Sequence, residues 1–183
     1  MFKKILARTA IVLAAVIAVL LAVIAIQPSE FRVTRSLAMS APVAAVFPLV
    51  NELKKWEPWS PWAKLDPNAK NSYEGPAAGV GSSMAWVGNS DVGEGKMTIT
   101  ESKANELVRF RLDFYKPMAG TSDAEFTFKA DGNTTTVTWT MTGKNDFIGR
   151  AVCMVMNMDT MIGGQFEKGL AAIRAMVETP AKP

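Results

Sequence analysis

The sequence predicts an α+β fold, a curved antiparallel sheet of about six to seven strands wrapped around one long C-terminal helix and preceded by an N-terminal transmembrane helix. Three observations predict it. Residues 10–26 are all apolar, residues 72–142 divide into strand-length runs separated by glycine and asparagine, and residues 146–177 carry apolar side chains at helical spacing. Because the later strands are joined by short turns, a parallel βαβ fold is excluded.

The N-terminal segment is long enough to cross a bilayer. An α-helix rises about 1.5 Å per residue, so residues 5–26 would cover about 33 Å, against a hydrocarbon core of about 30 Å. Lys3, Lys4 and Arg8 flank its N-terminal side, which by the positive-inside rule places the N-terminus in the cytoplasm. The predicted organisation is a cytoplasmic tail at 1–4, a single-pass anchor at 5–26, a linker at 27–30 and an extracytoplasmic domain at 31–179, facing the periplasm from the inner membrane if the source is bacterial.

A cleaved secretory signal is the alternative interpretation of this segment. Lys3 and Lys4 would form its basic start, and Val23-Ile24-Ala25 is a passable cleavage motif. The apolar run is, however, longer than the roughly 7–15 residues usual for the apolar region of a signal. We therefore expect an uncleaved anchor.

The domain begins with a strand and a short helix. Odd-numbered residues of 31–39 are mostly apolar, as expected of a strand with one buried face, and Arg35 interrupts that face. A helix is predicted over 41–52, because Pro42 suits its first turn. Pro48 predicts a break or kink in this helix.

Residues 56–62 hold three tryptophans and two prolines, which is incompatible with a regular helix or a central strand. The segment is predicted to be a compact aromatic turn. Trp56, Trp59 and Trp62 could form the rim of a cavity or contact lipid headgroups, where tryptophan is favoured. Alternatively, they fill one end of the core, as large aromatic side chains commonly do.

Six further strands are predicted in the middle of the chain. Apolar and polar residues alternate within them, so that Phe126 and Phe128 share one face and Glu125 and Lys129 the other. This alternation indicates an antiparallel sheet with one dry face and one wet face. The predicted strands are residues 72–74, 82–87, 95–103, 107–114, 121–130 and 134–142, the last two joined by a turn at 131–133.

The spacing of apolar residues becomes helical after residue 146. These residues recur at threes and fours as far as Val177, with the polar Asp159 among them. One helix over 146–177 would be roughly 45 Å long, enough to cross a whole sheet. Gly163 and Gly164 lie inside this predicted helix, where each glycine is less favourable than alanine by on the order of 1 kcal/mol. Their presence predicts close backbone packing, a kink or room for a ligand.

The composition excludes several kinds of function. Without the three basic residues before Gln27, the 20 Lys and Arg fall to 17 and balance the 17 Asp and Glu, so charge gives no support for a nucleic-acid partner. The chain has no histidine, which removes Ser-His-Asp and Cys-His catalysis and the common zinc sites. Its single cysteine, Cys153, cannot form an intramolecular disulfide and is predicted to be an inert buried thiol. We expect no metal and no cofactor.

Short landmarks follow one another through the domain in a specific order. They are Arg35-Ser36, Ala41-Pro42, Val46-Phe47, Trp56, Trp59-Ser60-Pro61-Trp62, Asp66-Pro67, Tyr73, Gly75-Pro76, Gly79-Val80-Gly81, Trp86, Gly93-Glu94-Gly95, Thr135-Thr136-Val137-Thr138-Trp139, Asp159, Gly163 and Phe166-Glu167-Lys168-Gly169-Leu170. In this order they resemble the SRPBCC superfamily (START/Bet v 1-like), in its polyketide cyclase/dehydrase-like branch. The resemblance covers about residues 31–177.

The resemblance implies a helix-grip fold with a cavity, between the sheet and the C-terminal helix, for lipids, sterols, polyketides or other apolar molecules. Because this fold carries many functions, membership alone does not define the activity. We expect a non-enzymatic, membrane-anchored domain that captures an apolar or amphipathic small molecule, with no catalytic residue and no metal ligand. The predicted lining is Trp86, Phe110, Phe126, Phe128, Trp139, Met141, Met158 and Ile162.

Two other functions remain open. A cyclase or dehydratase acting on a polyketide-like substrate would use Asp159 or Glu101 as base and Arg35 or Tyr73 as electrophilic partner. It requires Arg35 and a carboxylate to meet inside the pocket. A structural or partner-binding domain would instead fill the cavity with its own side chains and expose an apolar patch. The oligomeric state does not follow from the sequence.

Overall fold

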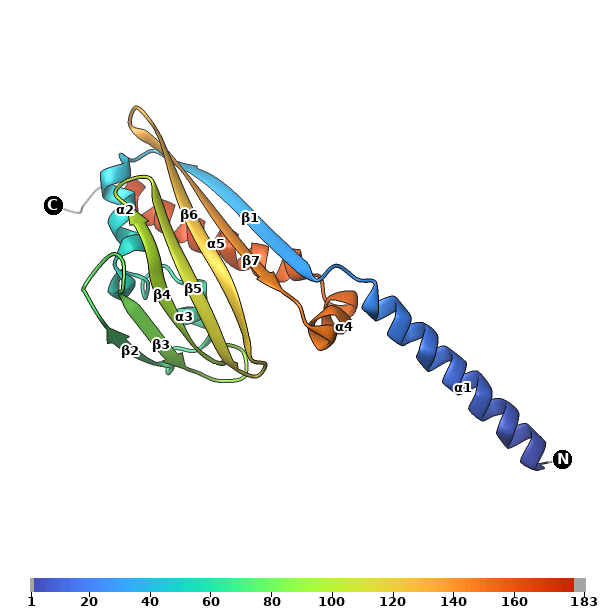
Figure 1. Cartoon of the computed structure of the whole chain (residues 1–183). Helices are drawn as coiled ribbons and strands as arrows, with labels where there is room; N and C mark the ends of the chain where they lie inside the picture. Colours follow the sequence, from blue (N-terminus) through green and yellow to red (C-terminus); the bar gives the residue numbers. More distant parts are fainter. Residues whose placement is uncertain (1, 180–183) are drawn as a thin grey trace. The chain divides into compact units, whose positions relative to one another are not determined.

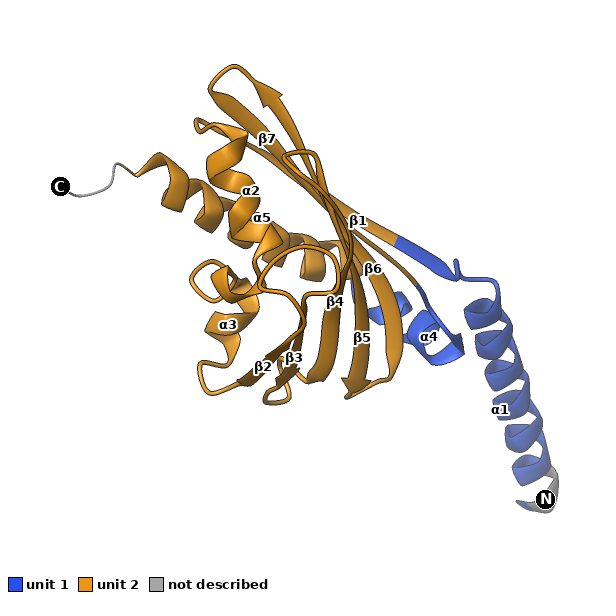
Figure 2. Cartoon of the chain, turned by 60° about the vertical axis from the view of Figure 1, so that its left-hand side comes forward, with its two compact units in different colours: residues 1–31, 144–157 blue, residues 32–143, 158–183 orange. Residues whose placement is uncertain are grey.

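The computed structural model describes residues 2–179, which form two compact units (Figure 1, Figure 2). Unit 1 contains residues 1–31 and 144–157, and unit 2 contains residues 32–143 and 158–183. The predicted fold class is confirmed, because the chain has a seven-stranded antiparallel curved sheet, a long C-terminal helix and an apolar N-terminal helix.

The sheet has the strand order β1-β7-β6-β5-β4-β3-β2 (Figure 1). The first strand therefore lies beside the last, and the hydroxyls of Thr34 and Ser36 hydrogen-bond those of Thr140 and Thr138 at 3.1 and 2.8 Å. The strands are β1 (Glu30–Met39), β2 (Lys70–Glu74), β3 (Ser83–Val87), β4 (Glu94–Lys103), β5 (Leu107–Lys116), β6 (Gly120–Asp131) and β7 (Thr134–Lys144). All seven overlap the predicted strands, with ends that differ by up to two residues.

The sheet buries one face, as the alternation predicts. On β6, Phe126 and Phe128 are buried, while Glu125 is partly exposed on the opposite face. That outer face carries ion pairs between neighbouring strands: the Arg109 guanidinium lies 2.5 Å from a Glu101 oxygen and 2.6 Å from a Glu125 oxygen. Opposite charges on adjacent strands support the pairing of β4, β5 and β6.

Helices cover the buried face of the sheet within unit 2 (Figure 2). Helix α5 buries Phe166, Leu170 and Ile173. Pro48 lies inside α2 without ending it, so the predicted break is absent. The aromatic turn contains a short helix that the sequence analysis missed, although a proline after Ser60 is a usual helix start. The elements are α2 (Val43–Asn51), the 3₁₀ turn η1 (Leu53–Lys55), α3 (Pro61–Leu65) and α5 (Met158–Glu178).

The single helix predicted over residues 146–177 is wrong. Helix α4 (Phe147–Val155) ends at Met156, whose backbone is extended with φ −118° and ψ 125°, and α5 begins at Met158. The sequence does contain a signal for this interruption. Asn157 is a favoured residue before a helix start, and Asp159 places an acidic side chain in the first turn of α5. The single helix was predicted from the spacing of apolar residues alone, and that spacing continues across the interruption.

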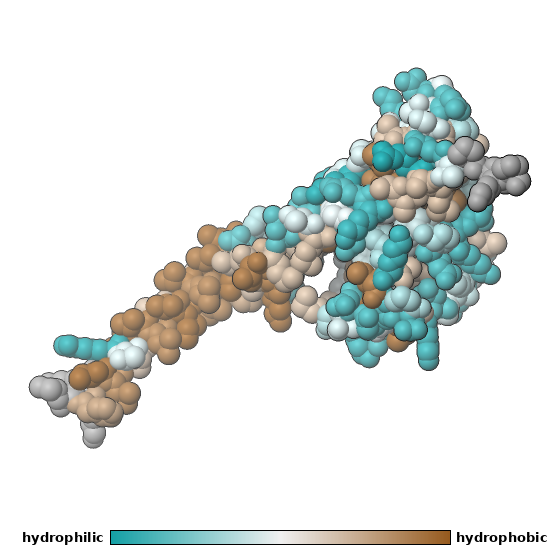
Figure 3. All heavy atoms as spheres, turned by 180° about the vertical axis from the view of Figure 1, so that it is seen from behind, coloured by the Kyte–Doolittle hydropathy of each residue, from teal (hydrophilic) through white to brown (hydrophobic). Residues whose placement is uncertain are grey.

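Unit 1 contains α1 (Phe2–Ala25) and α4. Figure 3 shows hydrophobic residues along α1, whose apolar side chains are mostly exposed. Residues 5–25 are long and apolar enough to cross a membrane, a test that a signal sequence near the N-terminus also passes. Insertion, its orientation and the predicted boundaries at 1–4, 5–26 and 27–30 stay predictions.

Candidate functional site

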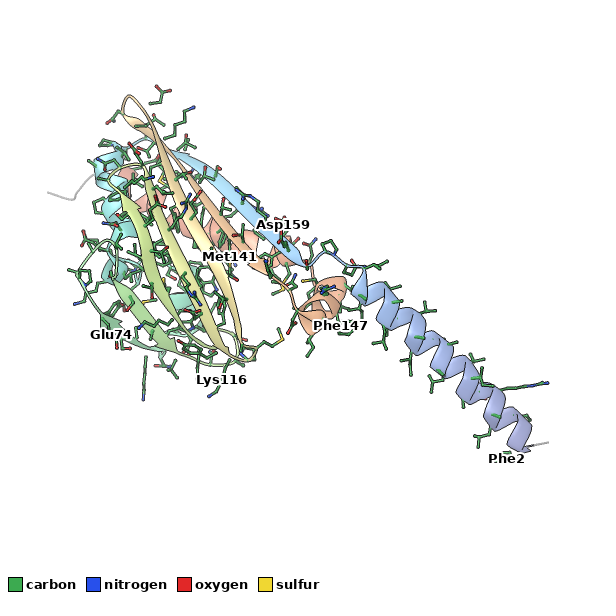
Figure 4. The ribbon with its side chains drawn as sticks, viewed as in Figure 1. Phe2, Glu74, Lys116, Met141, Phe147 and Asp159 are labelled. Atoms are coloured by element: carbon green, nitrogen blue, oxygen red, sulfur yellow. The ribbon has the colours of Figure 1, made fainter. Side chains whose placement is uncertain are left out.

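Unit 2 contains a cavity of about 500 Å³, bounded by the inner face of the sheet, α5 and the segment around α3. Its interior is lined by apolar side chains, because the buried faces of β3 to β7 all point toward the helices. Met141 on β7 is one of them (Figure 4). The apolar lining consists of Trp56, Trp62, Ala63, Met84, Trp86, Val92, Met97, Phe110, Leu112, Phe114, Ala124, Trp139, Met141, Ile162 and Phe166.

Polar side chains also belong to the cavity lining. Glu57, Lys64, Asn71 and Tyr73 are exposed, whereas the apolar lining residues are buried or half-buried. Partial burial and the nearby Glu57 carboxylate raise the pKa of Tyr73, so its hydroxyl stays protonated and can donate a hydrogen bond. The cavity therefore combines an apolar interior with a polar opening.

Asp66, which also borders the cavity, holds two loops together. Its carboxylate oxygens accept hydrogen bonds from the backbone N–H groups of Asn68 at 3.0 Å and Asn89 at 2.7 Å. Asp66 thus joins the segment after α3 to the loop between β3 and β4. Its role is explained by loop structure, because both carboxylate oxygens already have backbone partners.

Five of the eight predicted lining residues border the cavity, namely Trp86, Phe110, Trp139, Met141 and Ile162. The other three lie outside the lining. Phe126 is stacked on Trp139 with ring centroids 4.5 Å apart, and Phe128 packs edge-on against Phe47 of α2 at 5.4 Å. Met158 is the first residue of α5, a position that follows from the break between α4 and α5. Ligand contact stays a prediction for all eight.

Several lining residues were missed although the sequence carries a signal for some of them. Leu112 and Phe114 have the same strand parity as Phe110, so they share its face. Met97 likewise shares the inner face of β4. The sequence suggests Tyr73 only as the electrophilic partner of the enzyme hypothesis, and nothing local in the sequence indicates that it borders a cavity.

Trp56 and Trp59 fill the core, which decides between the two interpretations of the aromatic turn. Both are buried, and their indole N–H groups donate to the carbonyl oxygens of Val50 and Leu49, each at 2.9 Å. Trp56 and Trp62 also border the cavity, and Trp62 differs in being only half-buried. The turn therefore supplies both core packing and one cavity wall.

Trp139 lies at the centre of the aromatic core. Its ring is stacked against Phe166 at 4.0 Å and against Phe126 at 4.5 Å, and only 2% of the residue is exposed. Unlike those of Trp56 and Trp59, its indole N–H is buried with no hydrogen-bond acceptor among residues 2–179. A donor left without a partner in the interior normally destabilises a protein, so it invites an acceptor from outside the chain.

Two glycines leave room for the aromatic lining. A Cβ at Gly169 of α5 would lie 3.0 Å from Cζ3 of Trp139 and 3.3 Å from Cδ of Pro61. A Cβ at Gly95 of β4 would overlap the ring of Trp86. Alanine at Gly95 would therefore displace the Trp86 ring, and alanine at Gly169 would need Trp139 or Pro61 to shift slightly.

Arg35 pairs with carboxylates of α5 outside the cavity. Its guanidinium donates to both carboxylate oxygens of Asp159, at 3.0 and 2.9 Å, and to Glu167 at 2.6 Å. Asp159 lies at the start of α5 (Figure 4). The hydrogen bonds from Arg35 hold the pKa of Asp159 below its ordinary value. Because none of these residues lines the cavity, the meeting inside the pocket that the enzyme hypothesis requires does not occur.

Glu101 lies on the outer face of the sheet, although strand parity places it on the inner one. A β-bulge between Ile99 and Glu101 shifts the register, so Glu101 pairs with Arg109. Its carboxylate also lies 2.9 Å from Nζ of Lys103. Among the described residues, no group of three His, Cys, Asp or Glu side chains is arranged to hold a metal ion.

The two adjacent glycines of α5 have different surroundings, which predicts different effects of alanine on stability. A Cβ at Gly163 would overlap the Arg35 guanidinium, whereas a Cβ at Gly164 would have no neighbour within 4 Å. Gly164→Ala is expected to raise the free energy of unfolding by about 1 kcal/mol, because alanine favours the helix. Gly163→Ala should lack this gain, because Arg35 must leave its carboxylates. Urea denaturation of both variants measures the difference, and equal stabilisation would contradict the proposed role of Gly163.

Comparisons with known proteins agree with this geometry. The family described as polyketide cyclase/dehydrase and lipid transport matches residues 30–178. The Aha1 dimer from Colwellia psychrerythraea has a similar structure, with a TM-score of 0.59, 14% identity, and coverage of 83% of this chain and 99% of that one. CalU16 from Micromonospora echinospora has a TM-score of 0.55 and 13% identity, with coverage of 84% of this chain and 86% of that one. Ara h 8.0201 has a TM-score of 0.52 and 8% identity, with coverage of 79% of this chain and 97% of that one. These likenesses show the fold alone. A search of curated proteins found no match.

Proposed function

The chain belongs to the polyketide cyclase/dehydrase and lipid transport family, and we propose that its domain binds one amphipathic, largely apolar small molecule in the cavity of unit 2 while α1 holds the domain at a membrane. Family and fold support a ligand-binding domain and agree with the predicted SRPBCC resemblance. The observation that carries the proposal is the cavity of about 500 Å³, a volume within the range of small-molecule sites.

The apolar interior supplies the binding energy. A ligand that buries about 300 Å² of apolar surface gains about 7 kcal/mol from its removal from water. Micromolar affinity corresponds to about 8 kcal/mol after the entropy lost on association is subtracted. A ligand that binds this tightly must therefore bury more apolar surface than this and fill the cavity well. A small or fully polar molecule would gain too little.

The polar opening favours a ligand with one polar end. Glu57, Lys64, Asn71 and the protonated hydroxyl of Tyr73 lie where that end would meet water. Trp139 borders the cavity, and its buried indole N–H has no acceptor among the described residues, which supports a second polar feature in the ligand: a carbonyl or ether oxygen that would reach this nitrogen once the surrounding side chains move apart. Aromatic ketones, oxygenated polyketides and oxidised lipids share this chemistry.

Trp139→Phe tests the proposed hydrogen bond from this N–H to the ligand, because phenylalanine keeps a ring between Phe126 and Phe166 and removes the donor. For 9-fluorenone, which has a carbonyl oxygen, we expect the variant to bind about fivefold more weakly than the natural chain, as for one neutral hydrogen bond. For fluorene, which lacks the oxygen, affinity should be unchanged. Competition binding with both probes measures this, and an equal loss for both would rule out the hydrogen bond.

The proposed function is tested by purifying the full chain from its own host, extracting the bound small molecules and identifying them by mass spectrometry. A molecule present at about one per chain and strongly enriched over its share in the membrane would support the proposal and identify the ligand. If only lipids in bulk membrane proportions are recovered, and the protein fails to take up apolar probes, the proposal is wrong. That result would favour the cyclase or structural alternatives.

The proposed orientation, with the domain outside the cytoplasm, is tested separately. In intact cells with a permeabilised outer envelope, an added protease should digest the domain and leave α1 protected. Digestion only after the membrane is lysed would reverse the orientation. Recovery of a chain beginning after residue 25 would instead show that the segment is a cleaved signal.

A further inference from the structure

Helix α4 has no buried residue and exposes most of its apolar side chains. The exposed fraction is 43% for Phe147, 62% for Ile148, 44% for Met154 and 86% for Val155. Exposed apolar residues of this size on consecutive turns indicate a surface that is covered in the functional protein.

The four exposed apolar residues of α4 share one side of the helix with the half-buried Ala151. At about 100° per residue, positions 147, 148, 151, 154 and 155 fall within an arc of about 120°. Arg150 lies outside this arc, about 100° from its centre, and Phe147 lies at the start of the helix (Figure 4). The helix therefore presents an exposed apolar side, and the residue that joins α4 to α1 lies outside that side.

The flank of α4 that carries Arg150 is joined to the end of α1, within unit 1. Nη1 of Arg150 donates a hydrogen bond to the carbonyl oxygen of Ala25, the last residue of α1, at 2.8 Å. Just before α4, the backbone N–H of Asn145 donates to the carbonyl oxygen of Ser29 at 2.7 Å. Arg150 thus satisfies a carbonyl that the helix end leaves free, and it holds α4 at the level where α1 stops.

We propose that α4 is an interfacial helix that inserts its apolar side, formed by Phe147, Ile148, Ala151, Met154 and Val155, into the bilayer leaflet in which α1 ends. This inference rests on the proposed membrane span of α1. The end of a spanning helix lies where hydrocarbon gives way to headgroups, which is the depth that amphipathic helices occupy. Arg150 then points toward the polar side of the interface.

Charge argues for insertion by apolar burial and against capture by anionic lipid. Residues 144–157 contain Lys144, Asp146 and Arg150, a net charge of only +1. The lysine- and arginine-rich face of helices that depend on anionic lipid is absent from this segment of the described chain. Insertion is therefore expected in zwitterionic phosphatidylcholine.

The test uses the full chain in phosphatidylcholine nanodiscs with one nitroxide label at a time. Cys153→Ser removes the single native cysteine, and Val155→Cys places the label on α4 at a position whose exposure lets it accept a substitution. Leu13→Cys in α1 and Lys129→Cys on exposed β6 are the lipid and water controls. Collision rates with oxygen, which concentrates in lipid, and with a water-soluble nickel chelate report the depth of each label.

The label at position 155 is expected to collide with the nickel chelate at least about fivefold less often than the label at 129, and to approach the oxygen accessibility of position 13. Water-like accessibility at 155, with lipid-like accessibility at 13, overturns the inference and leaves the span intact. Water-like accessibility at 13 overturns the span and the inference with it. A label at 155 shielded from both reagents, whose spectrum sharpens on dilution with unlabelled chain, would show contact with a second copy instead.

Discussion

A chain carrying Met84→Trp and Leu112→Trp is expected to lose ligand binding while remaining folded. Both residues line the cavity, and both are only half-buried, so an indole at each position can extend into empty space without displacing packed neighbours. We expect affinity for apolar probes to fall at least about 100-fold, because the volume that a ligand would occupy is filled. The free energy of unfolding should change by less than about 1.5 kcal/mol, since the added atoms replace a void.

The measurement is the fluorescence of N-phenyl-1-naphthylamine with the full chain in nanodiscs, above the signal of empty nanodiscs. A matched control carries Val87→Trp and Tyr115→Trp, which add two tryptophans at exposed strand positions outside the lining. This control should bind as the natural chain does. Equal binding by the cavity-filled variant would show that the dye, and by extension the ligand, binds elsewhere.

Trp139→Ala is expected to lower the free energy of unfolding by about 3–5 kcal/mol, the usual cost of removing a large buried aromatic side chain. The ring is stacked between Phe126 and Phe166, so its loss leaves a hole at the centre of the aromatic core. Because domains are stable by only about 5–15 kcal/mol in total, the variant should be close to unfolding at 37 °C.

Urea denaturation followed by circular dichroism measures this loss. Trp139→Phe serves as the comparison, because it retains an aromatic ring at the same position and should lose only about 1–2 kcal/mol. A loss below about 1 kcal/mol in Trp139→Ala would mean that Phe126 and Phe166 close the gap. The aromatic stack would then contribute far less to stability than its geometry indicates.

Much of the fold follows from local patterns. The alternation around Phe126 and around Trp139 predicts the paired strands β6 and β7, since one dry face imposes a period of two. Helical spacing also predicts α5, but it misses the break at Met156, because apolar spacing continues while the backbone does not. Capping residues such as Asn157 carry that information, and the spacing alone does not.

The site could be predicted only in part. Strand parity identifies which residues face inward, and so it finds Phe110, Trp139 and Met141. Phe126 and Phe128 have the same parity but lie where the aromatic turn and α2 cover the sheet, so their side chains are packed against protein. Parity gives the face of a sheet, whereas a cavity depends on where helices leave that face uncovered.

The sequence by itself determined the apolar N-terminal helix, the antiparallel strands, the C-terminal helical region and the family, because each depends on local composition, spacing or the order of short motifs. Only the tertiary structure decided that Arg35 meets Asp159 across 124 residues and that a bulge turns Glu101 outward. It also decided that Trp139, at the cavity wall, has a buried N–H without a partner among residues 2–179. These features arise from contacts between distant segments. A cavity is the space that such contacts leave unfilled, and no local pattern encodes it.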